Sequence, residues 1–174
     1  HENELAQARA LDKPFAKYWV HNGLLTVNGE KMSKSLGNFI TVEQLLKDWK
    51  PDHLKLFFLK THYRSPIDYS DASMEEAKKN WEEFDEFFQH YIQTEADTVA
   101  GGVLPDKARE FFVQFHQAMD DDLNTPKALS VLFNLVNLGH ATLNSGQKDK
   151  LFLARGIKDV LVECSKCLGL SLEL

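Results

Sequence analysis

The second half of the sequence spaces its apolar residues with the period of an α-helix, and this pattern limits the possible folds more than any other feature. In residues 73–92 an apolar side chain recurs every three or four positions: Ala77, Trp81, Phe84, Phe88 and Tyr91. This spacing places them in one stripe along a helix, and such a stripe has to be buried against other elements. We therefore predict that the stripe is core.

More helices are predicted after this one. Similar apolar patterns run through three further segments, residues 107–121, 125–144 and 148–170. Asn124 or Thr125 is a candidate N-cap for the second of them, and Pro126 suits its first turn. Residues 94–106 are predicted to be a loop. The fold class is therefore predicted to be mainly α, with residues 70–174 forming an antiparallel bundle of about four helices.

Residues 1–69 are predicted to be less regular. The spacing of apolar residues predicts a helix over residues 2–13. The segments FAKYWV and LLTV flank Asn22-Gly23, and this arrangement predicts two short strands joined by a hairpin-like turn. The sequence thus predicts two parts, an irregular one and a helical bundle, divided near residue 70.

A second Asn-Gly pair, Asn28-Gly29, leads into a loop that is predicted to end at Thr41. Thr41 and Gln44 have the spacing of a capping box at the start of a helix. Pro51 suits the first turn of the helix that follows. Residues 62–71 are rich in turn-forming residues and are predicted to be a loop.

The charge of the chain is unevenly distributed. The net charge is −6, from 20 Lys and Arg residues against 26 Asp and Glu residues. Residues 1–70 hold 10 basic and 8 acidic residues, which is +2, and residues 71–174 hold 10 and 18, which is −8. The bundle is therefore not an obvious nucleic-acid surface, and anion-binding chemistry is better placed in the first part. We expect no membrane partner, because no run of about 18 apolar residues is present.

Cys164 and Cys167 are the two cysteines of the chain, in the order C-S-K-C. Such a pair is either a redox or zinc-binding pair or two small residues one helical turn apart. We favour the second interpretation, because no second pair and no nearby histidine supplies further metal ligands. So few cysteines fit a reducing compartment, and we expect a cytoplasmic location.

The segment NGEKMSKSLGN, residues 28–38, places two ammonium groups close together on a polar loop. Lys31 and Lys34 can both reach one polyanion, and Ser33 and Ser35 add hydroxyl donors. Glycines at both ends of the segment permit the loop to move. A loop of this kind is suited to stabilising charge on a departing pyrophosphate, and the alternative is a solvated basic loop. We expect residues 29–35 to be mobile, because nothing apolar is predicted to anchor them.

The sequence resembles the cysteinyl-tRNA synthetases, which are class I aminoacyl-tRNA synthetases. Five stretches carry the resemblance in this order: HENE, YWVHNG, EKMSKSLGNF, HYRSPIDYS and AMDDDLNTP. They span most of residues 1–125, and the helical remainder fits a DALR-type domain. The resemblance implies that residues 1–69 are the C-terminal end of a catalytic region with a stem-contact-like connection. It also implies that residues 70–174 are a helical domain that docks along tRNA.

The resemblance also implies an activity and its site residues. The family activates cysteine with ATP and transfers the cysteinyl group to the 3′ end of tRNA(Cys). Its KMSKS segment contacts the ATP phosphates, and this segment is Lys31, Met32, Ser33, Lys34 and Ser35 in the present chain. Lys34 matches the ATP-contacting lysine and Lys31 is its partner, so these two are the candidate catalytic residues.

A zinc ion that ligates the substrate thiolate is implied by the same resemblance. Its protein ligands are two cysteines, a histidine and a glutamate, and Glu4 matches the glutamate. His1 matches the neighbour of the ligand histidine rather than the ligand, and neither cysteine of this chain matches a ligand cysteine. We expect no bound zinc in this chain, and the alternative for His1 and Glu4 is a frayed, solvated terminus.

The resemblance implies that this sequence is a fragment. The HIGH-containing N-terminal part of the catalytic region and the C-terminal anticodon part are both expected to lie outside it. The isolated chain is therefore predicted to be inactive. Two alternatives differ in function: a ligase that joins cysteine to glucosaminyl-inositol in mycothiol synthesis, and a non-catalytic helical binding module.

Three other segments are candidate functional sites, each with a structural alternative. Trp19 and His21 lie close to the active site in the family, or else Trp19 packs in the hairpin core while His21 makes a turn hydrogen bond. Residues 62–64 (His-Tyr-Arg) contact RNA or, as we favour, pack between the loop and the bundle with Arg64 paired to a carboxylate. Residues 120–122 (Asp-Asp-Asp) bind a cation or, as we favour, precede a helix N-terminus, where negative charge is favourable.

Overall fold

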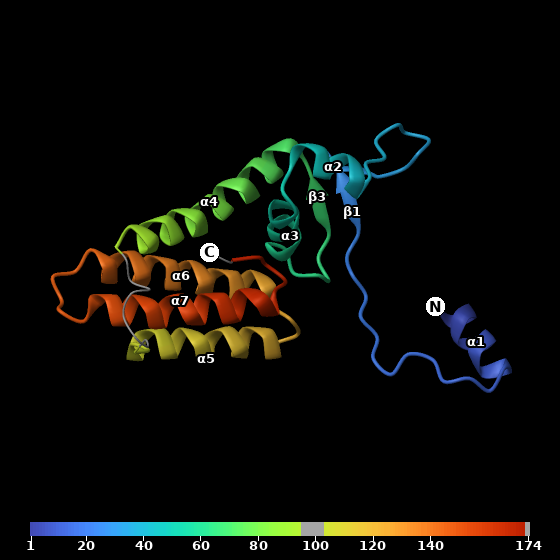
Figure 1. Ribbon diagram of the computed structural model, residues 1–174. Coiled ribbons are helices and arrows are strands. Elements are labelled where there is room, and N and C mark those ends of the chain that lie inside the picture. The colour runs from blue at the N-terminus through green and yellow to red at the C-terminus, as the bar shows by residue number, and fades with distance from the viewer. Residues whose placement is uncertain (95–102, 173–174) are drawn as a thin grey trace.

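The computed structural model describes residues 1–94 and 103–172, and α-helices dominate it (Figure 1). Four long helices form the bundle: α4 (Asp71–Gln93), α5 (Asp106–Asp120), α6 (Thr125–Leu143) and α7 (Lys150–Cys167). Helix α6 packs against the other three, and α5 also contacts α7. The predicted mainly α fold with a C-terminal helical bundle is confirmed.

Three of the four bundle helices start at a side-chain cap or a proline, whereas α7 starts without a side-chain cap. Ser70 caps α4 by accepting a hydrogen bond from the Ser73 backbone N–H, and Asn124 caps α6 through the Lys127 backbone N–H. These bonds satisfy backbone donors that have no partner inside the helix. The predicted loop at 94–106 lies mostly outside the described residues, and its described end, residues 103–105, is neither helix nor strand.

The apolar stripe predicted for the first bundle helix is buried throughout. Phe84 has no exposed surface, and its ring lies 5.0 Å from that of Phe133 on α6. Phe87, which the predicted stripe omitted, is also fully buried. It packs against Gly139, where a Cβ atom would lie 2.3 Å from the Phe87 ring, so α4 and α6 approach closely at this point.

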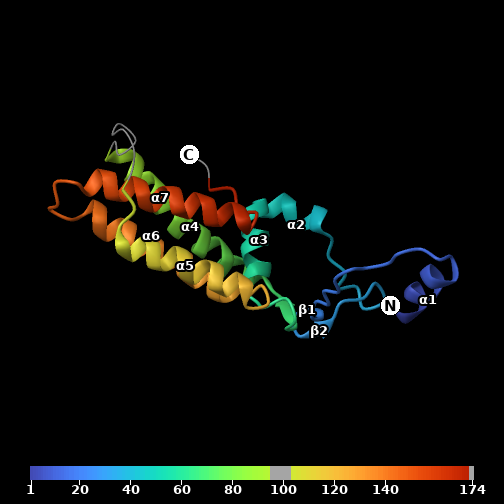
Figure 2. The same ribbon diagram turned by 90° about the horizontal axis from the view of Figure 1, so that it is seen from below.

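Residues 1–69 contain three helices: α1 (Glu2–Ala10), α2 (Val42–Asp48) and α3 (Pro51–Leu59). Helix α1 has no buried residue and stands apart from the bundle (Figures 1 and 2). The predicted capping box of Thr41 and Gln44 is present at the start of α2, and Pro51 opens α3. Helix α3 packs against α4, so it joins this part of the chain to the bundle.

The first part also contains a small three-stranded sheet, with the strand order β2-β1-β3. Its strands are β1 (Leu25–Val27), β2 (Glu30–Lys31) and β3 (Ile67–Tyr69). Strand β1 pairs antiparallel with β2 and parallel with β3, with Val27 opposite both Glu30 and Tyr69. The predicted loop at 62–71 therefore contains a strand, which the turn-forming residues around it concealed.

The predicted hairpin turn at Asn22-Gly23 is wrong, and the hairpin turns one Asn-Gly pair later. Asn28 and Gly29 have φ values of 51° and 78°, the two consecutive positive values that a two-residue hairpin turn requires. Residues 15–20 form no strand. Gly23 serves a different purpose: its backbone N–H donates to the Tyr63 carbonyl at 2.6 Å, where two segments cross.

We expect the substitution Gly23→Ala to destabilise the protein, because the crossing leaves no room for a methyl group. A Cβ atom at this position would lie 2.0 Å from the Ser65 carbonyl oxygen. Overpacking of this kind lowers the free energy of unfolding by about 1–3 kcal/mol. Urea titration followed by circular dichroism measures the change. Gly146→Ala, which meets open space, is the control, and equal midpoints for the two variants would contradict the prediction.

Candidate functional site

The loop that carries Lys31 and Lys34, residues 31–38, is called the lysine loop here; it begins at the end of β2 and is closed by hydrogen bonds within the loop. Asn38 bridges it: its side-chain oxygen accepts from the Ser33 backbone N–H at 2.8 Å, and its amide nitrogen donates to the Lys31 carbonyl at 3.2 Å. Ser33 Oγ lies 3.3 Å from Ser35 Oγ and accepts a bond from the Leu36 backbone N–H. The loop therefore has a defined conformation. Asn38 was not among the predicted site residues, although an Asn next to a glycine is a frequent turn residue.

Both lysines of the loop point their charges toward solvent. Lys31 and Lys34 are exposed, and neither ammonium group forms an ion pair with any residue that the structure describes. The Lys34 ammonium lies 5.4 Å from the centre of the Phe39 ring, within the range of a cation–π contact. Two adjacent cationic groups without internal counter-charges are available to an external polyanion.

The expectation that nothing apolar anchors the loop is wrong, because Met32 anchors it. Its side chain is half-buried and packs against the hydrophobic core. The methionine between the two lysines therefore faces inward, while both ammonium groups face outward.

Asp68 on β3 holds the turn that precedes the lysines. Its Oδ1 accepts hydrogen bonds from Thr26 Oγ1 at 2.6 Å and from the Gly29 backbone N–H at 2.8 Å. These two bonds favour the charged carboxylate and lower the pKa of Asp68. Asp68 was not among the predicted site residues, because the strand that carries it was not predicted. The alternation Ile-Asp-Tyr between turn residues was the signal for that strand.

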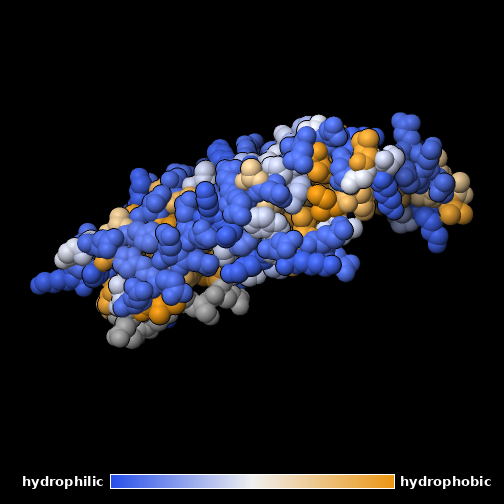
Figure 3. Space-filling view, turned by 90° about the horizontal axis from the view of Figure 1, so that it is seen from above, coloured by the Kyte–Doolittle hydropathy of each residue, from blue (hydrophilic) through white to orange (hydrophobic). Residues whose placement is uncertain are grey.

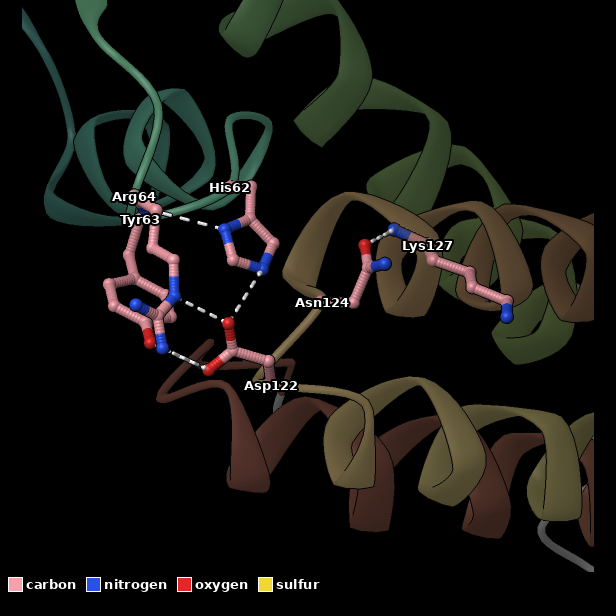
Figure 4. A network of polar contacts seen from close by, with 6 residues as sticks. All are labelled: His62, Tyr63, Arg64, Asp122, Asn124 and Lys127. Atoms are coloured by element: carbon pink, nitrogen blue, oxygen red, sulfur yellow. Dashed lines mark hydrogen bonds and ion pairs between the residues drawn. The ribbon is translucent and has the colours of Figure 1, made fainter. Parts of the chain in front are cut away.

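A polar network joins the segment before β3 to the corner between α5 and α6 (Figure 4). The Asp122 carboxylate accepts hydrogen bonds from Tyr63 Oη at 2.7 Å and from Nε and Nη2 of Arg64. These contacts hold the pKa of Asp122 well below its ordinary range, at about 2. Arg64 is thus paired to a carboxylate, as expected, and that carboxylate belongs to the Asp-Asp-Asp segment ahead of α6.

The Asp122 network predicts a dependence of stability on pH. The pKa of this carboxyl is 3.8 when unperturbed and about 2 in the folded protein. The folded state therefore favours the charged form, and this stabilisation is complete above about pH 4 and lost as the pH falls toward 2.

We expect Asp122→Asn to melt at a lower temperature than the original protein at neutral pH, with the difference vanishing near pH 2. Melting curves of both proteins across this range check the prediction. Asp120→Asn is the control, and a difference that does not change with pH would contradict it.

The N-terminal candidates form an aromatic cluster. The His1 ring lies 4.9 Å from the His21 ring, and Trp19 stacks on His21 at 5.9 Å with an interplanar angle of 7°. Trp19 is 43% exposed, so the alternative that places it in a hairpin core is wrong. Its surroundings differ because the hairpin turns at Asn28-Gly29 instead.

Glu4 lies on the exposed helix α1, beside the N-terminus. A backbone hydrogen bond and the N-terminal ammonium group, 3.4 Å away, lower the pKa of Glu4. Within residues 1–94 and 103–172, no three His, Cys, Asp or Glu side chains come together in a way that would hold a metal ion. Glu4 as a zinc ligand therefore stays a prediction.

The two cysteines are unpaired, with Cys164 buried and Cys167 exposed. Burial raises the pKa of the Cys164 thiol to about 12, so this thiol is a poor metal ligand and a poor nucleophile. The interpretation as two helix residues one turn apart fits these environments. In the parts of the chain that are described, no helix is long and apolar enough to span a membrane.

Large apolar side chains remain exposed mainly in the first part of the chain. They include Phe15, Trp19, Val20, Leu36 and Phe39. The space-filling view shows part of this apolar surface to the right of the bundle (Figure 3). The first part is therefore less well covered than the bundle, in which the large side chains are mostly buried.

Two protein families match separate parts of the chain. Residues 1–79 match the family described as tRNA synthetases class I (C) catalytic domain, and residues 114–173 match the DALR domain. The first range includes the lysine loop and the sheet, and the second includes α6 and α7.

Relatives of known name agree with these families. The cysteine–tRNA ligase of Persephonella marina is 50% identical over 140 residues, which are 78% of this chain and 29% of that protein. The cysteine–tRNA ligase of Syntrophotalea carbinolica is 39% identical over 175 residues, which are 98% of this chain and 36% of that protein. The chain thus spans about a third of the length of these curated relatives.

A solved structure shows the same arrangement of elements. It is the ternary complex of LeuRS from Agrobacterium radiobacter with tRNA and LeuAMS, with a TM-score of 0.70 and 18% identity. The match covers 95% of this chain and 23% of that chain. At this level of identity the likeness shows the fold alone.

Proposed function

Because the chain belongs to the cysteine–tRNA ligase family of class I aminoacyl-tRNA synthetases, we propose that it takes part in activating cysteine with ATP and in transferring the cysteinyl group to tRNA(Cys). The observation that carries this proposal is the lysine loop. Two exposed ammonium groups, from Lys31 and Lys34, project from a closed loop and have no internal counter-charge among the described residues. Such a site is complementary to a triphosphate.

The proposed chemistry uses the loop to stabilise a leaving group. In the activation step the cysteine carboxylate attacks the α-phosphorus of ATP, a new phosphorus–oxygen bond forms and pyrophosphate departs. Negative charge grows on the departing pyrophosphate, and the ammonium groups of Lys31 and Lys34 are placed to meet it. Ser33, Ser35 and the backbone around Met32 complete the proposed ATP-binding segment.

The two parts of the chain have different proposed roles. Residues 1–69 would form the C-terminal end of the catalytic region, and residues 70–174 would dock along tRNA. The exposed apolar surface of the first part supports this division, because such a surface is suited to packing against further protein. The contacts of the bundle with RNA would be local, because residues 71–174 carry a net charge of −8.

Glu4 is the residue of this chain that we propose as a zinc ligand. The described residues supply this one carboxylate of the ligand set that the family resemblance implies, and Glu4 is exposed on a helix of its own. Zinc would hold the substrate thiolate when bound. The other ligands would come from protein outside residues 1–174.

The two alternatives are less well supported. The glucosaminyl-inositol ligase is not favoured, because relatives that are 39–50% identical are named cysteine–tRNA ligases. The other alternative is a non-catalytic module that retains the loop only by descent. Such a module would give no activity when it replaces the matching segment of an active enzyme. The following experiment separates this second alternative from the proposal.

The test is a chimaeric enzyme. Residues of this chain replace the matching segment of the Persephonella marina cysteine–tRNA ligase, and cysteine-dependent exchange between ATP and pyrophosphate is measured. We expect exchange in the chimaera and none in the isolated chain. A folded chimaera that binds tRNA but shows no exchange would overturn the proposal, and circular dichroism establishes that it is folded.

A further inference from the structure

Two histidines from different bundle helices lie in direct contact near one end of the bundle. His90 is in the last turn of α4 and His140 is in the last turn of α6. Their Nδ1 atoms are 3.1 Å apart, and their rings lie 5.4 Å apart at an angle of 24°. Both side chains are half-buried, so solvent still reaches them.

The backbone packing of α4 and α6 holds this pair in place. The two helices approach closely at Gly139, because a Cβ atom there would collide with the Phe87 ring. Phe87 lies about one helical turn before His90, and its ring meets the edge of His140 at 5.6 Å and 85°. The contact between the histidines is therefore set by a rigid helix crossing rather than by two mobile surface side chains.

Two protonated imidazoles cannot occupy this geometry. At 3.1 Å one Nδ1 must be an acceptor, and an imidazolium has no acceptor. Burial, followed by the charge of His90, lowers the pKa of His140, while Glu86 opposes this shift. His140 is consequently neutral at pH 7, which is the form that ligates metals.

The surroundings nevertheless favour a cation. Both α4 and α6 end within a few residues of the pair, and helix C-termini carry partial negative charge. Beside His90, α4 borders an open depression of about 370 Å³ that is lined by acidic and amide side chains, including Glu82, Asp85 and Glu86. Neutral histidine nitrogens surrounded by negative charge are suited to binding a divalent metal ion. Protonation of both rings is less suitable, because it would bring two imidazolium groups into contact.

We propose that His90 and His140 form a two-histidine site for a divalent transition metal ion, with Zn²⁺ as the reference ion. Two histidine nitrogens on one tetrahedral zinc lie about 3.3 Å apart, given zinc–nitrogen bonds of about 2.0–2.1 Å. The observed Nδ1 separation of 3.1 Å needs only a small adjustment. Binding requires both Nδ1 lone pairs, so the proton on one Nδ1 moves to the Nε2 of the same ring.

Water would fill the remaining coordination positions of the metal ion. No third His, Cys, Asp or Glu side chain joins the pair to form a metal-binding group within the described residues. Glu86 acts on His140 through its charge and would partly balance the charge of the ion. Affinity is therefore expected to be micromolar rather than that of a closed structural zinc site, and to weaken at acid pH because protons compete with the metal ion for the ring nitrogens.

Titration calorimetry of ZnCl₂ into the 174-residue chain tests the proposal. We expect one equivalent to bind at this site, and His90→Gln or His140→Gln to weaken that binding at least about tenfold. His116→Gln, on the exposed face of α5, and His21→Gln, in the N-terminal cluster, are matched controls that keep it. A Cys167→Ser background removes the exposed thiol as a competing ligand.

Thermal denaturation with and without Zn²⁺ is a second measurement, for the case in which a variant folds too poorly for calorimetry. At free Zn²⁺ of about 100 times Kd, the melting temperature of the original chain should rise by roughly 5–10 °C, and those of the His90 and His140 variants should not. If the chain binds no Zn²⁺, or if both variants bind it as the original does, the pair is only a hydrogen-bonded contact and the proposal is wrong. None of these outcomes depends on the proposed ligase activity.

Discussion

Lys34→Ala in the chimaeric enzyme is expected to lower the rate of ATP–pyrophosphate exchange by about 100- to 1,000-fold. Lys34 is exposed and lies in a loop whose backbone is closed by Asn38 and Ser33, so the substitution removes a charge without disturbing the loop. The lost ammonium group would otherwise stabilise charge that develops on pyrophosphate in the transition state.

Steady-state exchange assays at several ATP concentrations separate this effect from a loss of ATP binding. A role in the transition state lowers kcat, whereas uniform binding of ATP raises KM alone. Lys47→Ala is the matched control, because Lys47 is an exposed lysine on α2, outside the loop. Equal rates for the Lys34 and Lys47 variants would show that the loop does not contact the reacting phosphates.

The second large effect concerns the bundle. Phe84→Ala is expected to lower the free energy of unfolding of the chain by about 3–5 kcal/mol, because it removes a fully buried ring. The Phe84 ring packs against Phe133 at 5.0 Å and Trp81 at 6.2 Å, so its loss leaves a cavity between α4 and α6.

Urea titration followed by far-ultraviolet circular dichroism measures this change. Phe58→Ala is the matched control, because it makes the same chemical change on α3 at a side chain that is 44% exposed. A loss of less than about 1.5 kcal/mol for Phe84 would mean that the surrounding helices collapse into the cavity.

The helices were predictable because their signals are local. Apolar spacing, the Thr41–Gln44 capping box and the prolines at helix starts all lie within a few residues of the structure that they specify. The predicted stripe omitted Phe87 because two adjacent phenylalanines both face inward, which makes the buried face wider than the simple period indicates.

Strand β1 falls within the predicted strand 24–27, but its pairing with β3 was missed because that pairing is not local. Strands β1 and β3 are each three residues long, and their partners are about 40 residues apart in the sequence. Two Asn-Gly pairs compete for the hairpin turn, and Gly23 is instead required where one backbone crosses another. The lysines and Met32 were identified through a motif, whereas Asp68 and Asn38 depend on contacts that only the folded chain forms.

The contact of Arg64 with Asp122 implies an order of assembly. These residues are 58 positions apart, and Asp68 is 39 positions from Gly29, whereas the contacts inside each bundle helix span about four. Closing long loops costs entropy that short-range contacts avoid, so helices form early and distant pairings form late. We therefore expect the individual helices to form before β1 pairs with β3. The turn at Asn28-Gly29, which Asp68 holds from 39 positions away, would then reach its final conformation late in folding and lose it early in unfolding.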